Sequence, residues 1–269
     1  MTLSENPTLF AIFNVLERIK IYIKIFFSLC GYLKMRLIRK LFKLKNELFR
    51  NIFFEKRIKK TLDHKYTIYF DKKNNSEISK LASLYRTNKG YILDKNNTEG
   101  IDIKNCYSYS DFYSDIFSLS KNHVKKVFEL GIGSVDTQQI DNMLPIGKKY
   151  KSGGSLRMWK DYFKNANIYG ADIDKKCLFE EERIKTFYVD QGKKDSIFDM
   201  WKEIGETDFD IIIDDGCHRF EETITFFESS IDKMSNNGIY IIEDILASQR
   251  KPFLQYFKKS NFNYKFINF

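Results

Sequence analysis

The chain has 269 residues, of which 43% are hydrophobic and 30% are charged. This length and composition suit one ordinary domain with an appendage and exclude a chain too polar to form a packed core. The net charge of +9 comes from residues 1–60, which hold 14 Lys or Arg against 4 Asp or Glu; the rest of the chain sums to −1, which argues against a basic catalytic region.

Residues 1–75 are expected to form a basic helical extension. Between residues 8 and 60 there is one Gly and no Pro, and Leu or Ile recurs at spacings of three and four from Leu33 to Ile52. Three interpretations stay open at this point. The helix packs on its own domain or on a second copy of the chain, lies on an anionic membrane surface, or binds nucleic acid.

The expected location is the cytoplasm, with contact of the extension at the inner face of a membrane as an alternative. The apolar runs at 9–16 and 25–33 fall well short of the roughly 20 residues needed to span a bilayer. The four cysteines form no CxxC pair, so neither a zinc site nor a disulfide framework is indicated.

A second domain is expected over 76–269, with 76–125 as a lid or wall. Residues 77–86 and the aromatic segment YSDFYSDIFSLS read as helices. From Lys126 onward, strand patterns such as VFELGIG and FDIIIDD alternate with helix patterns such as SLRMWKDYFK and EETITFFESSI. This alternation predicts an α/β fold: a Rossmann-like parallel sheet with helices on both faces.

In such a sheet, ligands bind beyond the carboxyl ends of the strands. At the first strand end, Glu129 precedes Gly131 and Gly133, which let the backbone turn tightly and approach a ligand closely. The pattern favours a nucleoside cofactor, although dinucleotide-binding folds and purely structural turns share it.

Two further strand ends carry acids suited to a nucleoside. Asp172 ends the second strand, where a carboxylate accepts hydrogen bonds from ribose hydroxyls. The alternative role is a helix N-cap, which Asp174 fits better. Asp190 ends the third strand and either reaches the adenine amino group or lies in a surface turn.

The fourth and fifth strand ends gather more acids. Asp214 and Asp215 end the fourth strand, His218 follows three residues later, and Glu243 and Asp244 end the fifth strand. Converging carboxylates are costly unless a cation joins them, which predicts a hard divalent ion such as Mg²⁺. His218 is either a general base or a structural cap of the next helix.

Taken together, these motifs resemble the metal-dependent class I methyltransferases that modify sugar hydroxyls, such as the macrolide sugar O-methyltransferases. The resemblance covers roughly 80–245 and rests on GGSLRMWKDYFKNANIYGADID, VDQ, IIIDDGCH and IIED. It implies S-adenosylmethionine as cofactor and a divalent cation, Mg²⁺ or similar. The implied metal ligands are Asp215, Glu243 and Asp244, and the implied base is His218. The implied cofactor contacts are Glu129, Gly131, Gly133, Ser155, Asp172, Asp190 and Asp214.

Two departures from the family pattern affect the expectation. Val135 replaces the usual third glycine, and about 20 residues (134–154) separate the turn from the GGSL helix. Such an insertion is more typical of a functional loop than of a defect. Only NYKFINF remains for the usual C-terminal hairpin, so an incomplete hairpin and an open sheet edge are expected.

The sequence thus predicts an O-methyltransferase for a sugar or related polyhydroxylated small molecule, destined for a surface polysaccharide or a glycosylated metabolite, with no nucleic acid as partner. Homo-oligomerisation or membrane contact through residues 1–60 is expected. A nucleic-acid methyltransferase that uses the basic arm, and a membrane-associated binding module with a vestigial cofactor site, are the alternatives.

Overall fold

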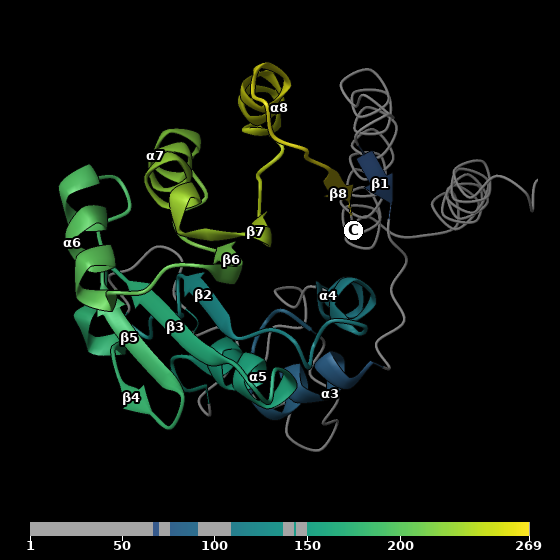
Figure 1. The fold of residues 1–269 in the computed structure, drawn as a ribbon, viewed down its shortest axis with the longest axis vertical. Helices are drawn as coiled ribbons and strands as arrows, with labels where there is room; N and C mark the ends of the chain where they lie inside the picture. The colour runs from purple at the N-terminus through teal and green to yellow at the C-terminus, as the bar shows by residue number, and fades with distance from the viewer. Residues whose placement is uncertain (1–66, 70–75, 91–108, 137–142, 144–149, 269) are drawn as a thin grey trace, which may run out of the picture. The chain divides into compact units, whose positions relative to one another are not determined.

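The structure, a computed structural model, describes residues 67–69, 76–90, 109–136, 143 and 150–268 (Figure 1). The chain divides into two compact units, residues 1–67 and 68–269. The predicted helical extension, residues 1–75, lies outside the described residues except for residues 67–69, which form a short strand. The boundary near residue 75 therefore stays a prediction, and the second unit is described below.

A six-stranded sheet forms the centre of this unit, in the order β4-β5-β3-β2-β6-β7. All neighbouring strands run parallel except β4, which is antiparallel to β5. The strands are β2 (Lys126–Leu130), β3 (Asn167–Asp172), β4 (Glu180–Glu181), β5 (Ile184–Tyr188), β6 (Phe209–Asp214) and β7 (Met234–Ile242). The predicted Rossmann-like α/β fold is confirmed, and β4 is an element that was not anticipated.

The central strands are buried on both faces, which explains their continuous apolar sequences. Successive side chains of a strand point to opposite faces. In β6, Ile211 and Ile213 pack with Trp159 on one face, whereas Ile212 packs with Trp201 on the other. An apolar core therefore lies on each side of the sheet, and a third apolar cluster joins the last two α-helices of the chain.

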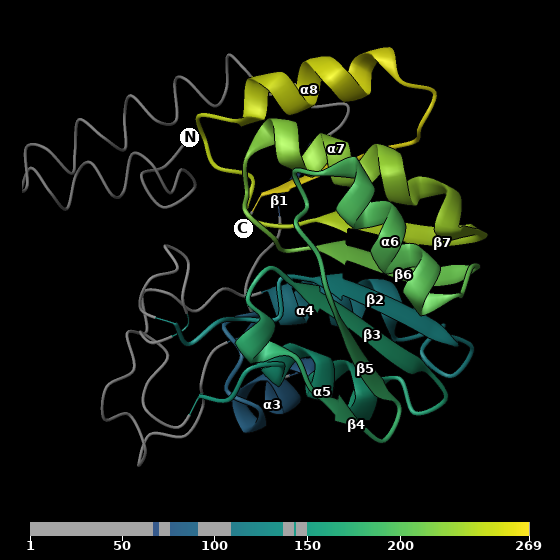
Figure 2. The ribbon, with the colours of Figure 1, turned by 90° about the vertical axis from the view of Figure 1, so that its left-hand side faces the viewer.

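Helices cover both faces of the sheet (Figure 2). One side carries α3 (Glu77–Leu84), α4 (Tyr109–Phe117) and α5 (Gly154–Tyr162); the other carries α6 (Lys194–Ile204) and α7 (Phe220–Ser230). The last helix, α8 (Arg250–Lys259), packs on α7 through Phe253 and Phe257. The predicted wall helices α3 and α4 thus pack with α5 in the core on this side of the sheet.

At the far edge of the sheet, β7 pairs only with β6 among the described strands. The last strand, β8 (Phe266–Asn268), instead forms a two-stranded sheet with β1 (Thr67–Tyr69). No described strand forms a hairpin with β7. Among the described residues, no helix combines the length and apolar character required to cross a bilayer.

Candidate functional site

The turn after β2 requires its glycines. Gly131 and Gly133 have φ values of +81° and +84°, in the left-handed region that side chains disfavour. A Cβ on Gly131 would lie 2.0 Å from the backbone oxygen of Asp215, so this turn packs directly against the chain that leaves β6. The end of β2 and the end of β6 therefore share one surface.

The long insertion after this turn returns to it. Met143 N donates to Ser134 O at 2.8 Å, and Gly153 N donates to Ile132 O at 2.8 Å. Val135, in the place of the usual third glycine, is exposed, and residues 137–142 and 144–149 lie outside the described part of the chain. The helix start at Gly154 is thereby fixed against the turn.

Asp172 connects the second strand end to the same turn. Its Oδ2 accepts a hydrogen bond from Ile132 N at 3.0 Å, and its Oδ1 accepts one from Asp174 N at 2.9 Å. Burial raises the pKa of Asp172. Asp174 caps the short helix η5 (Lys175–Cys177), which is the capping role the sequence suggested for it. A carboxylate has lone pairs for further donors, so ribose binding by Asp172 stays a prediction.

Asp190 faces outward at the end of β5. Its Oδ2 pairs with Lys193 Nζ at 2.7 Å, and this hydrogen bond lowers the pKa of Asp190. It lines an open cavity of about 350 Å³ between β5 and α6. Asp190 therefore lies in a partly exposed turn at a strand end. The predicted contact of Asp190 with adenine stays a prediction.

Asp214 is buried with one oxygen unsatisfied. Oδ1 accepts from Gly216 N at 3.2 Å, whereas neither Oδ2 nor the buried Nε2 of Gln191 has a hydrogen bond of good geometry among the described residues, although the Gln191 side chain lies close enough to the carboxyl to oppose the rise in its pKa. Burial raises the pKa of Asp214 to about 7. Unsatisfied buried polar atoms at a strand end are the kind of groups that a polar ligand satisfies.

Glu129 is fully buried inside the sheet end. Its Oε2 accepts a hydrogen bond from the indole of Trp159 in α5. Burial raises the pKa of this carboxyl, while the nearby ammonium of Lys89 and the hydroxyl of Ser155 act against that rise. Glu129 and Ser155, both predicted cofactor contacts, therefore lie together at the start of α5.

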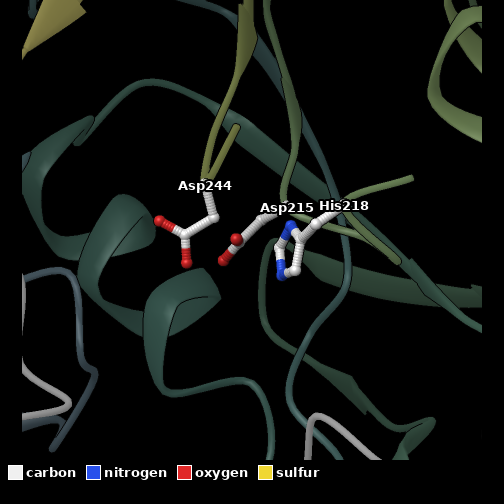
Figure 3. Close-up of side chains that lie close together, drawn as sticks. All are labelled: Asp215, His218 and Asp244. Atoms are coloured by element: carbon white, nitrogen blue, oxygen red, sulfur yellow. The ribbon is translucent and has the colours of Figure 1, made fainter. Parts of the chain in front are cut away.

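Three side chains converge on one point beyond β6 and β7. Ligand atoms of Asp215, His218 and Asp244 all lie within 4.8 Å of one another. Figure 3 shows both carboxylates and the imidazole projecting into the same space. His218 and Asp244 have φ values of +56° and +48°, and such left-handed non-glycine residues cluster at functional sites. Two carboxylate donors on one point fit a hard divalent cation.

Glu243, the other predicted metal ligand, does not join this group. Its Oε2 accepts from Lys89 Nζ at 2.7 Å, and its Oε1 accepts from the hydroxyl of Tyr113. Burial raises the pKa of Glu243, and the ammonium of Lys89 opposes that rise. We call Glu129, Asp215, Glu243 and Asp244 the acid cluster. Whether Glu243 binds a metal stays a prediction.

Sequence reasoning missed three residues that contact the acid cluster: Lys89, Tyr109 and Tyr113. Lys89 Nζ also lies 2.8 Å from Asp215 Oδ2. Burial alone would lower the pKa of Lys89, but the surrounding carboxylates, Asp215 first among them, raise it well above its usual value. The hydroxyl of Tyr109 donates to Asp244. The two tyrosines are four residues apart on α4, and this helical spacing was the only signal that both face one site.

Curated relatives support the assignment suggested by the motifs, while no family model matches the chain. The chain is 32% identical over 149 residues to 8-demethyl-8-alpha-L-rhamnosyl tetracenomycin-C 2'-O-methyltransferase of Streptomyces olivaceus, covering 55% of this chain and 36% of that protein. It is 31% identical over 171 residues to mycinamicin VI 2''-O-methyltransferase of Micromonospora griseorubida, covering 63% and 36%.

A solved methyltransferase of the mycinamycin pathway, in complex with Mg, SAH and mycinamycin VI, is 30% identical and matches 63% of this chain and 39% of its own, with a TM-score of 0.49. The chain thus spans little more than a third of the length of the relatives it matches. The resemblance found in the motifs is confirmed for the part of the chain that matches: it is similar in sequence to curated O-methyltransferases, two of which name a rhamnosyl unit and one an olivosyl unit.

Proposed function

We propose that the chain is an S-adenosylmethionine-dependent O-methyltransferase, assisted by a divalent cation, that methylates a hydroxyl of a sugar or related polyhydroxylated small molecule. The observation that carries the proposal is the convergence of Asp215, His218 and Asp244 beside the glycine turn. The relatives whose names include a rhamnosyl or an olivosyl unit support the acceptor class.

The residues around the glycine turn fit a nucleoside cofactor. The turn leaves no room for a Cβ at Gly131, Asp172 retains lone pairs for ribose hydroxyls, and the buried Oδ2 of Asp214 lacks a hydrogen bond of good geometry among the described residues. Ser155 opens α5 next to Glu129. We assign the cofactor to this surface, where S-adenosylmethionine would supply the methyl group.

Asp215 and Asp244 are the residues that would hold the cation. Mg²⁺ prefers oxygen donors over imidazole, so the two carboxylates suit it better than His218 does. A cation bound there would supply positive charge that favours ionisation of the acceptor hydroxyl. The imidazole of His218 then remains available to accept the hydroxyl proton on a ring nitrogen.

We infer that the acceptor presents neighbouring hydroxyls, since a cation held by Asp215 and Asp244 would still have coordination positions open to acceptor oxygens. Residues 61–269 sum to a net charge of −1, which argues against a nucleic-acid acceptor, and two of the relatives carry a rhamnosyl unit in their names. We therefore infer a sugar unit of a glycosylated metabolite or of a surface polysaccharide as the acceptor.

A labelled methyl donor tests the reaction. The purified chain is incubated with a panel of sugars that carry vicinal hydroxyls, with Mg²⁺ or with a chelator, and methylated product is counted. Transfer that requires Mg²⁺ supports the proposal, while undiminished transfer in chelator refutes the metal role.

The metal site is tested separately through Mn²⁺, whose binding is read by electron paramagnetic resonance. Asp244→Ala is expected to weaken Mn²⁺ binding at least tenfold, and the matched control Asp195→Ala, on the exposed first turn of α6, is expected to leave it unchanged. Equal binding by both variants would remove Asp244 from the ligand set.

A further inference from the structure

The ammonium of Lys89 lies among three carboxylates, and the proposed reaction assigns it no role. Its Nζ is 3.3 Å from Glu129 Oε1, 2.8 Å from Asp215 Oδ2 and 2.7 Å from Glu243 Oε2. The Lys89 side chain is only 1% exposed, so water screens these pairs weakly. Removing the ammonium of Lys89 would leave these buried carboxylates without a compensating positive charge.

The position of this ammonium is set by backbone packing. Lys89 follows α3, and its carbonyl oxygen accepts a hydrogen bond from Ser110 N of α4 at 2.9 Å. The next residue, Gly90, approaches α3 so closely that a Cβ there would lie 2.9 Å from Ala82 Cβ. The packing of this segment against α3 and α4 thus places the ammonium of Lys89 at the carboxyl ends of the adjacent strands β2, β6 and β7.

Lys89 also divides the acid cluster. Glu243 and Glu129 point to the ammonium, whereas Asp244 belongs with Asp215 and His218 to the three converging side chains, which we call the ligand group. Asp215 contacts both sides, because its Oδ2 binds Lys89 while the residue is a member of the ligand group. Lys89 therefore holds the orientation of Glu129, Asp215 and Glu243 through direct ion pairs, and it forms no such pair with Asp244 in the described part of the chain.

We propose that Lys89 is a positioning residue: an internal counter-ion that keeps the acid cluster assembled without metal and draws Glu243 away from the ligand group. The first part stands independently of the reaction. The second part, on the ligand group, rests on the proposed metal site. With the ammonium in place, an incoming divalent cation meets a less negative cluster, so Lys89 also moderates the affinity for that cation.

Thermal unfolding in chelator tests the counter-ion role. Lys89→Met is expected to lower Tm by roughly 6–20 °C, because it strands buried carboxylates. Glu243→Gln should lower Tm in the wild type but raise it in the Lys89→Met background, where it removes an unpaired charge. This reversal of sign distinguishes a counter-ion from mere packing, which would give additive effects. Additive effects overturn the proposal.

A matched control and a second readout guard against simple misfolding. Lys126 forms a partly exposed pair with Glu206 at 2.6 Å, so Lys126→Met should shift Tm by no more than about 4 °C. If Lys89→Met alone yields no folded protein, recovery of folding by the double variant with Glu243→Gln supports the proposal. If the double variant also fails while Glu243→Gln folds, the proposal is overturned.

Mn²⁺ titration tests the effect on the ligand group. Lys89→Met is expected to bind Mn²⁺ at least tenfold more tightly than the wild type and to gain more in Tm from added Mg²⁺. Unchanged or weaker binding refutes the moderating role. If the wild type binds no Mn²⁺ at all, the proposed metal site fails, and the unfolding series in chelator still decides whether Lys89 is a counter-ion.

Discussion

Replacing Gly131 by alanine should damage the site far more than the same change at Gly205, although both glycines have positive φ. Gly205 has φ +67°, and the nearest atom to a Cβ there is Lys202 O at 4.0 Å, so alanine meets only backbone strain of about 1–2 kcal/mol. At Gly131, φ is +81° and the Cβ would lie 2.0 Å from Asp215 O.

A real Cβ contact needs about 3 Å or more, so the turn and the β6 exit must separate by about 1 Å. Overpacking of this kind adds about 1–3 kcal/mol to the strain, for a total of about 2–5 kcal/mol. For a domain of this size, that is a loss in Tm of roughly 4–20 °C, against roughly 2–8 °C for Gly205→Ala.

Differential scanning calorimetry of both variants, with calorimetric titration of S-adenosylhomocysteine, measures the two consequences. Gly131→Ala should also bind the cofactor more weakly. Gly205 caps the C-terminal end of α6, so Gly205→Ala should keep the wild-type affinity. Equal losses in Tm together with wild-type affinity in Gly131→Ala would show that the turn tolerates a side chain, and would refute the assignment of the cofactor to this surface.

Further predictions concern individual side chains. His218→Ala should reduce methyl transfer about 10²–10⁴-fold with Tm nearly unchanged, measured by the labelled-donor assay; wild-type turnover would remove it as the base. In the native protein iodoacetamide should label Cys217 faster than Cys177, whose thiol is buried with its pKa raised to about 11, as read by peptide mass spectrometry; the reverse order would contradict the packing of η5. The hydrogen bond from Arg157 lowers the pKa of Glu181, so the pair adds stability above the usual carboxyl pKa near 4.5 that is lost as the pH falls below it. The Tm difference between wild type and Arg157→Met should therefore shrink below pH 4, and a difference constant with pH would show that packing alone is involved.

The parallel sheet and its strand-end acids were predictable because the signal is periodic and local. Runs such as FDIIID of β6 are apolar on both faces, and the carboxyl ends of parallel strands meet at one edge. That rule alone brings Asp215, His218 and Asp244 together from two different strands. It also places Glu129 and the glycine turn beside them.

The partners of these acids were not predictable, because they come from the wall helices rather than from the sheet. Lys89 is 126 residues from Asp215 and 154 from Glu243, and no periodic pattern relates such positions. The side-chain direction of Glu243 was not predictable for a related reason. Neighbouring residues at a strand end diverge, so an acidic pair in the sequence need not act as a pair in the site.

Main-chain hydrogen bonds tie the glycine turn, the proposed cofactor surface, to the strand ends that carry the proposed metal ligands. Gly131 N donates to Ala171 O at 2.8 Å, Asp215 N to Leu130 O at 3.0 Å, and Glu243 N to Asp214 O at 2.9 Å. Each of these bonds extends the parallel ladder by one step beyond a strand end. The distance between the glycine turn and the ligand group is therefore set by the sheet rather than by the loops. A shift at the β2 turn must move the backbone of Asp215 as well, so Gly131→Ala is expected to weaken Mn²⁺ binding together with cofactor binding, a linked loss that independent sites would not show.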